Sequence, residues 1–230
     1  MPSTTRKIAL AFLAVAALAG CSSATGAAPA TSSIRDAAAP EVLTQASANA
    51  RTQSTVHLRG NGQCPESAFY VDMRLRRDGG ATGSVRFGAS TVQVVSSGGS
   101  IYVQGPSSFW TAQDSPAAAT QIGTKWVRLS PGSNACLAAL TTFSTVLDNY
   151  LGYPGTPVKG QAQAVFGVPA VMLSLPGNVT IWVGAKGVPV PVRIDDPATK
   201  TGISLGEWGQ KVDVTAPTAT DVIDASAVKK

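Results

Sequence analysis

The sequence predicts a mainly β, α+β domain in which about ten strands form an antiparallel sheet and one or two helices lie against it. Apolar and polar side chains alternate strictly in residues 69–76, and shorter segments on either side repeat this pattern. Turn signals such as Asp78-Gly79-Gly80 separate these segments. Strands with one apolar and one polar face are typical of an antiparallel sheet that meets water on one side.

The composition excludes several classes of protein. Of the 230 residues, 44% are hydrophobic and only 13% are charged, against about 25% charged in average soluble proteins. Such a chain can bury a core, and it is neither disordered throughout, collagen-like nor a coiled coil. The low charge is unusual beside an ordinary apolar content. It suggests that water is not the only solvent that the protein meets.

The first residues have the features of a secretory signal. Arg6 and Lys7 precede an apolar run of 12 residues from Ile8 to Ala19. The run ends in Leu18-Ala19-Gly20-Cys21, which resembles the bacterial lipobox and implies cleavage before Cys21 and acylation of its thiol. The alternative is a plain secretion signal that happens to end near a cysteine. Loss of Arg6 and Lys7 would lower the net charge from +5 to +3.

These features divide the chain into four parts. Residues 1–20 are the predicted signal peptide, and residues 21–33 form an uncharged tether from the lipidated Cys21. Residues 34–224 form the domain, and residues 225–230 form a frayed tail. We therefore expect a protein anchored by lipid to the extracytoplasmic face of the cell membrane.

Elements follow in order along the domain. Residues 35–52 predict an amphipathic helix after Pro40, and residues 134–151 predict a second helix from apolar residues at three- and four-residue spacing. Phe109 and Trp110 lie in a predicted loop or short helix. Pro189 and Pro191 predict an edge strand or a strand that pairs on one side only. Strands are predicted at 56–59, 69–76, 84–87, 92–94, 101–103, 126–129, 160–166, 170–175, 179–183, 188–194 and 202–208, with a short end piece at 212–214 and 222–223.

Two cysteines remain once Cys21 is acylated. Cys64 and Cys136 form an even pair, which outside the cytoplasm predicts a disulfide. The alternative is two separate buried thiols. The chain has one histidine, so no metal site and no cofactor are predicted. No basic run suited to nucleic acid is present; the densest group, Arg74, Arg76 and Arg77, predicts a solvated sheet face, with contact to anionic lipid as the alternative.

A family resemblance rests on the end of the chain. Residues 202–214 read GISLGEWGQKVDV, and residues 179–183 read VTIWV. With the lipobox, the tether and the Ser54-Thr55-Val56-His57 segment, they are similar to the actinobacterial lipoproteins of the LprG and LppX type, which are related in fold to the carrier LolA. The resemblance covers most of residues 34–215. The Cys64 and Cys136 pair departs from the typical pattern, which puts the size and entrance of a pocket in doubt.

The resemblance implies a curved antiparallel half-barrel around helices, with an apolar cavity that holds acyl chains of a lipid or glycolipid. Such a protein assists lipid transport or localisation and would meet a membrane transporter. The sequence alone does not choose between a cavity and a packed core. The expected cavity residues are Val71, Met73, Leu75, Val85, Phe87, Leu140, Phe143 and Leu147.

Two other functions compete with this one. No nucleophile elbow, zinc-protease motif or P-loop occurs, so we do not expect an enzyme. His57 lies on the polar face of a strand, and we interpret it as an exposed histidine or one at a sheet edge. Asp195-Asp196 precedes Pro197, which predicts a turn. The stronger alternative is a non-catalytic lipoprotein that docks a transporter, sensor or wall enzyme, with Phe109 and Trp110 either as an exposed anchor or packed over the sheet.

Overall fold

The structure is a computed structural model that describes residues 34–65, 67–130 and 132–229. The predicted signal peptide, Cys21 and the tether lie outside the described residues. Within the described part there are five α-helices and thirteen strands. The helices are α1 (Ala39–Thr52), α2 (Ser107–Gln113), α3 (Pro116–Ile122), α4 (Ala135–Thr141) and α5 (Phe143–Leu151). The strands are β1 (Thr55–Gln63), β2 (Ala68–Arg76), β3 (Ala81–Phe87), β4 (Ser90–Ser97), β5 (Ser100–Gln104), β6 (Trp126–Arg128), β7 (Val158–Lys159), β8 (Gln163–Val165), β9 (Val168–Leu175), β10 (Val179–Gly184), β11 (Pro191–Asp196), β12 (Thr201–Gly206) and β13 (Val222–Asp224).

All thirteen strands belong to one open, curved sheet. Its order is β13-β6-β5-β4-β3-β2-β1-β12-β11-β10-β9-β7, with β8 also on β9. Two antiparallel runs, β1–β6 and β9–β12, meet where β1 pairs with β12. The fold class is therefore confirmed. The sheet is mixed rather than wholly antiparallel, because β13 runs parallel to β6.

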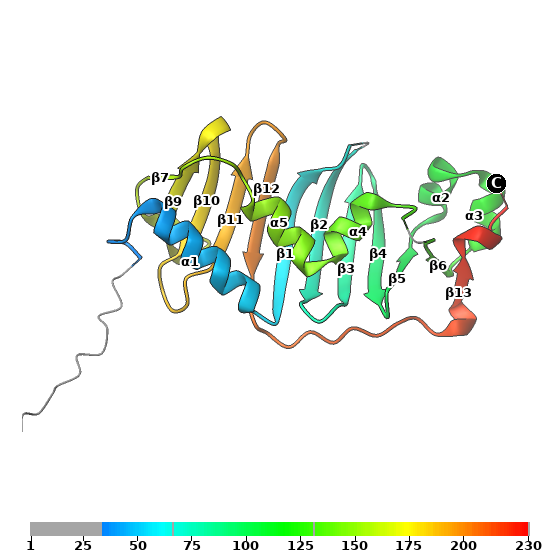
Figure 1. Cartoon of the computed structure of the whole chain (residues 1–230). Coiled ribbons are helices and arrows are strands. Elements are labelled where there is room, and N and C mark those ends of the chain that lie inside the picture. The colour runs from blue at the N-terminus through cyan, green and yellow to red at the C-terminus, as the bar shows by residue number, and fades with distance from the viewer. Residues whose placement is uncertain (1–33, 66, 131, 230) are drawn as a thin grey trace, which may run out of the picture. The chain divides into compact units, whose positions relative to one another are not determined.

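The segment that leads to β13 explains this parallel pair. Between β12 and β13 the chain passes along the strand ends of the sheet (Figure 1). The Gly209 N–H donates to the Thr55 carbonyl at 3.2 Å, and the Thr55 hydroxyl donates to the Gln210 carbonyl at 2.7 Å. The predicted strand at 212–214 is therefore wrong, because this stretch crosses the strand ends and pairs with no strand.

The register puts apolar side chains on one face. Leu58 lies between Met73 on β2 and Leu205 on β12, and all three are buried. Helices α1, α4 and α5 lie across this face (Figure 1). Their buried side chains, among them Val42, Leu140 and Leu147, join the same core as the sheet. No helix of the described residues is both long and apolar enough to cross a membrane.

The predicted helix at 134–151 is broken into two. Thr142 has an extended backbone, with φ −109° and ψ 112°, and it separates α4 from α5. The hydroxyls of Thr141 and Thr142 donate to the carbonyls of Leu137 and Ala138, both at 2.8 Å. Such side-chain bonds to the preceding turn disfavour a straight helix. The break changes the direction of the helical layer over the sheet. We call α4 and α5 together the cover.

The edge strand predicted at 188–194 lies inside the sheet. β11 pairs with β10 on one side and β12 on the other. It tolerates proline because it begins at Pro191, beside a register shift between Trp182 and Val183. Phe109 and Trp110 are 9% and 5% exposed on α2, so they pack in the core and do not form an exposed anchor.

Two central glycines allow strands to approach closely. Gly60 in β1 and Gly83 in β3 have φ values of 144° and 150°. A Cβ at these positions would lie 2.0 Å from the Gly202 carbonyl oxygen and 2.2 Å from the Asp72 carbonyl oxygen. A side chain at either site would therefore push apart the strands that form the middle of the sheet.

Candidate functional site

The eight predicted cavity residues all belong to, or pack against, the one large hydrophobic core between the sheet and the helices. Val71, Met73 and Leu75 lie on β2, Val85 and Phe87 on β3, and Leu140, Phe143 and Leu147 on α4 and α5. Phe87 is partly buried, and the other seven are buried members of the core under the helices. The sequence therefore identified residues of the core, and their role in binding stays a prediction.

These side chains fill the space between them. Val71, Met73, Leu75, Val85 and Leu147 are each 0% accessible to a water-sized sphere. No void large enough for a water molecule therefore adjoins these five side chains. The interior is thus packed in this conformation. Acyl binding at these residues stays a prediction, and it would require the helical cover to move.

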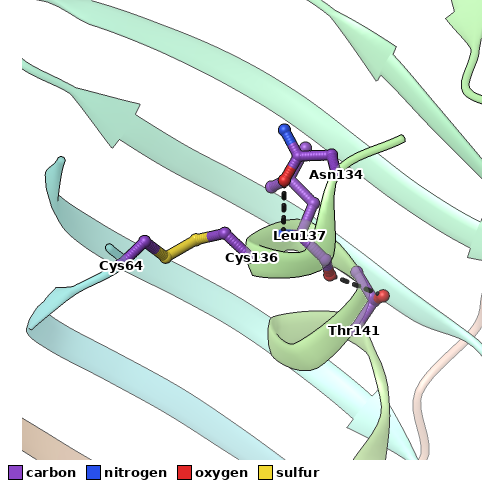
Figure 2. Close-up of a disulfide and its surroundings, with 5 residues drawn as sticks. All are labelled: Cys64, Asn134, Cys136, Leu137 and Thr141. Carbon is purple, nitrogen blue, oxygen red and sulfur yellow. Dashed lines mark hydrogen bonds between the residues drawn. A yellow bond between two sulfur atoms is a disulfide. The ribbon is translucent and has the colours of Figure 1, made fainter. Parts of the chain in front are cut away.

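One covalent bond fixes the cover to the sheet. Cys136 at the start of α4 is joined to Cys64, which directly follows β1, with the Cα atoms 5.8 Å apart. Figure 2 shows this disulfide beside the cap of α4, where the Leu137 N–H donates to the Asn134 side-chain oxygen at 2.9 Å. The cap and the disulfide together define where α4 begins.

The rest of the contact between cover and sheet is apolar. Within the described residues, no side-chain hydrogen bond or ion pair joins α4 or α5 to a strand. The cover is linked laterally instead, since Arg51 of α1 forms an ion pair with Asp148 of α5 at 2.7 Å. Burial raises the pKa of Tyr150 to about 12, so this residue of α5 stays neutral. Contacts of this kind have little directional preference, so α5 can shift over the sheet without breaking a polar bond to a strand.

A pocket of about 900 Å³ opens beside the cover. Phe143 is the only one of the eight predicted residues that lines it, with Ile101 and Leu129 as further apolar neighbours. Arg76, Arg77 and Arg128 also line it. Arg76 and Arg128 form ion pairs with Asp78 and Asp224. Both aspartates line the pocket as well, so Arg77 is the arginine there whose charge is not balanced by an ion pair among the described residues, and the pocket joins a polar rim to the edge of the apolar core.

A larger groove lies on the opposite face of the sheet. It has a volume of about 1170 Å³ and crosses β10, β11, β12 and β1. His57, which lines it, was predicted to be exposed or at an edge, and this is wrong: its side chain is 12% exposed on a central strand. Its Nε2 lies 2.7 Å from Asp72 Oδ1, and its Nδ1 lies 3.1 Å from Glu207 Oε1. The sequence missed this cluster because Glu207 is 150 residues away along the chain.

Glu207 gives the cluster a pH dependence. The Arg74 guanidinium donates to Glu207 at 2.9 Å, and this bond, followed by the charge of His57, holds the pKa of Glu207 below its ordinary 4.5. A lowered pKa stabilises the fold above pH 4.5, and this contribution disappears as the pH falls through the folded-state value.

We predict that Glu207→Gln loses this contribution. The variant should be less stable at pH 7 by less than about 1 kcal/mol, since the pair is half exposed. The difference should vanish at acidic pH, below the folded-state pKa. Urea unfolding of both proteins from pH 3 to pH 7 measures it. A difference that is constant over that range would show that the charge of Glu207 is not its cause.

Asp195 and Asp196 each interact with neighbouring groups of the chain. Asp196 accepts hydrogen bonds from the N–H groups of Ala198 and Thr199, at 2.9 and 3.4 Å, which is the predicted turn role. Asp195 forms an ion pair with Arg193 at 2.6 Å. Both carboxylates are thus engaged in holding the β11–β12 connection and the outer face of β11.

The geometry defines an open, curved sheet with a helical cover, and comparison with known proteins assigns the same fold. No protein-family model and no curated protein matches the chain. The structure is similar to LprF from Mycobacterium bovis, with a TM-score of 0.57, 16% identity, and coverage of 79% of this chain and 97% of LprF. This confirms the half-barrel fold that the resemblance to the LprG and LppX type implied. A second solved structure, MucB in complex with MucA(peri), has a TM-score of 0.30 and 13% identity and covers 75% of this chain and 54% of MucB, which is too low to support an argument.

Proposed function

We propose that this chain is a cell-envelope lipoprotein, anchored through Cys21, that binds acyl chains of a lipid or glycolipid and assists its transport or localisation. The observation that carries the proposal is the apolar contact of α4 and α5 with the sheet, which one disulfide secures. An acyl chain can replace these helical side chains on the sheet without leaving a buried polar group unpaired. The acyl chain therefore competes with α5 for the apolar face.

Apolar burial is the driving force for such an exchange. Each buried methylene of an acyl chain contributes about 0.8 kcal/mol. The cost is the loss of apolar contacts between the helices and the sheet, rather than of hydrogen bonds to a strand. The pocket beside Phe143 is the natural entrance, because Arg77, which forms no ion pair among the described residues, attracts an anionic head group while the chain follows the apolar core. A membrane transporter would deliver or receive the lipid.

Mass spectrometry of the full-length protein tests the function. We expect protein from a bacterial host that processes lipoproteins to carry acyl groups on Cys21 and to co-purify with lipid. Cys21→Ala should leave the membrane fraction and stop incorporating labelled palmitate. Unchanged labelling of that variant would refute the anchor.

A matched pair of variants locates the entrance. Ala138 lines the pocket beside Phe143, whereas Ala139 is a partly buried neighbour outside it. We expect Ala138→Trp to reduce the co-purified lipid and Ala139→Trp to retain it. Equal lipid content in the two variants would place binding elsewhere.

The packed interior favours one alternative function. A non-catalytic lipoprotein that docks a transporter, sensor or wall enzyme needs no cavity, and the outer groove of about 1170 Å³ offers it a surface. Protein that is repeatedly free of lipid, together with cross-linking of the outer groove to one membrane protein, would support this alternative.

A further inference from the structure

Exposed apolar side chains gather at one margin of the sheet. Among the described residues, the large hydrophobic side chains that are exposed are Val158, Phe166, Val168 and Val188, at 67%, 70%, 37% and 58%. All four lie between β7 and the start of β11. Exposed hydrophobic residues scattered singly need no explanation, but a group at one margin marks a contact surface.

Phe166, Val168 and Val188 lie on two neighbouring connections. Phe166 and Gly167 link β8 to β9, and residues 185–190 link β10 to β11. The Ala185 N–H donates to the Pro169 carbonyl at 2.7 Å, which holds the two connections together. Both also border the outer groove. We call Phe166, Val168 and Val188 with Lys186 the tip surface.

The conformation of Phe166 is costly for folding. Phe166 and Gly167 have φ values of 50° and 78°, as in a tight two-residue hairpin turn that favours asparagine and glycine. A phenylalanine in this left-handed backbone conformation raises the free energy of the folded state, and its ring is also exposed to water. An outlier of this kind points to a role outside the fold.

Basic groups accompany the exposed side chains. Lys186 precedes Val188 by two residues and has no ion-pair partner among the residues described. The Arg193 guanidinium lies 5.6 Å from the centre of the Phe166 ring. An aromatic ring beside aliphatic and basic side chains suits the interface of an anionic membrane.

The start of the described chain lies on the same edge of the sheet, beside the end of β9 that is opposite the tip surface. The Lys159 ammonium of β7 donates to the carbonyls of Ile34 and Arg35 at 3.4 and 2.9 Å. Cys21 precedes Ile34 by 13 residues, which span at most about 45 Å when fully extended. This step rests on the proposed anchor: acylation of Cys21 would keep this margin within reach of the bilayer.

We propose that the tip surface docks onto the anionic phospholipid surface of the membrane that holds the anchor. Phe166 and Val188 enter the head-group region, and Lys186 binds lipid phosphate. The contact sets the orientation of the domain and brings the outer groove next to the bilayer.

The anchored full-length protein in vesicles tests this docking. A fluorescent label on Val188→Cys reports contact through quenching by nitroxide-labelled lipid, and the same label on Gln113→Cys serves as control. Gln113 is exposed on α2, near the other end of the sheet (Figure 1). We expect stronger quenching at 188 than at 113 in vesicles of phosphatidylcholine with phosphatidylglycerol, and weaker quenching at 188 without phosphatidylglycerol.

A second variant isolates the tip. Adding Phe166→Ser to Val188→Cys should reduce the quenching at 188 while the anchor remains. Equal quenching at 188 and 113, or no effect of Phe166→Ser, would overturn the docking. If docking is lost but lipid still co-purifies, the docking proposal fails and the proposed function stands. If docking is observed but no lipid co-purifies, the proposed function fails and the docking proposal stands.

Discussion

Replacing Cys64 and Cys136 together with serine is expected to lower the free energy of unfolding by about 4 kcal/mol. The disulfide closes a loop of 72 residues, and its removal frees the unfolded chain while the native contacts remain. The same change releases the start of α4 from the segment that follows β1. We therefore expect faster uptake of lipid as well as lower stability.

Urea unfolding measures the first effect, and the rate of uptake of a fluorescent fatty acid measures the second. Wild-type protein in reductant is the control, because its free energy of unfolding should match that of the double variant. Reductant should not change the stability of the double variant itself. Unchanged stability would mean that the disulfide constrains neither state. A slower uptake in the double variant would contradict the mobile cover.

Leu147→Ala is expected to destabilise the fold by about 2–5 kcal/mol. Leu147 is 0% exposed between α5 and the apolar face, so its truncation removes contacts and leaves a cavity. If the cover competes with an acyl chain, this cavity should also increase the affinity for lipid. Stability and affinity would then change in opposite directions.

Thermal or urea unfolding and a fatty-acid titration measure these two quantities. Val188→Ala is the control for stability, because Val188 is 58% exposed and its truncation should change the free energy of unfolding by about 0.5 kcal/mol or less. A loss below about 1 kcal/mol for Leu147→Ala would contradict the packed interior. Reduced affinity would place lipid binding away from α5.

Local pattern determined most of the fold. Strict alternation in β2 and helical spacing after Pro40 predicted elements that the structure contains. The regularity also identified the buried face, so Val71, Met73 and Leu147 were found together from sequence. Such patterns are reliable because each side chain responds to the same boundary between core and water.

Other features depended on residues far apart in the chain. Periodicity did not show that β1 pairs with β12, that β13 lies parallel to β6, or that β11 is an internal strand. The break at Thr142 depends on side-chain bonds that a helical pattern hides. The partners of His57 come from β2 and from the end of β12, which only the sheet register brings together.

The sequence by itself determined a mainly β domain and its apolar face, because these follow from local periodicity and composition, whereas the bond between Cys64 and Cys136 was shown by the structure. The tertiary structure decided that the face is filled by its own helices and that Phe166 and Val188 share one exposed margin. Packing density and strand order both depend on contacts between residues that are far apart in the sequence. A local sequence pattern does not specify those contacts.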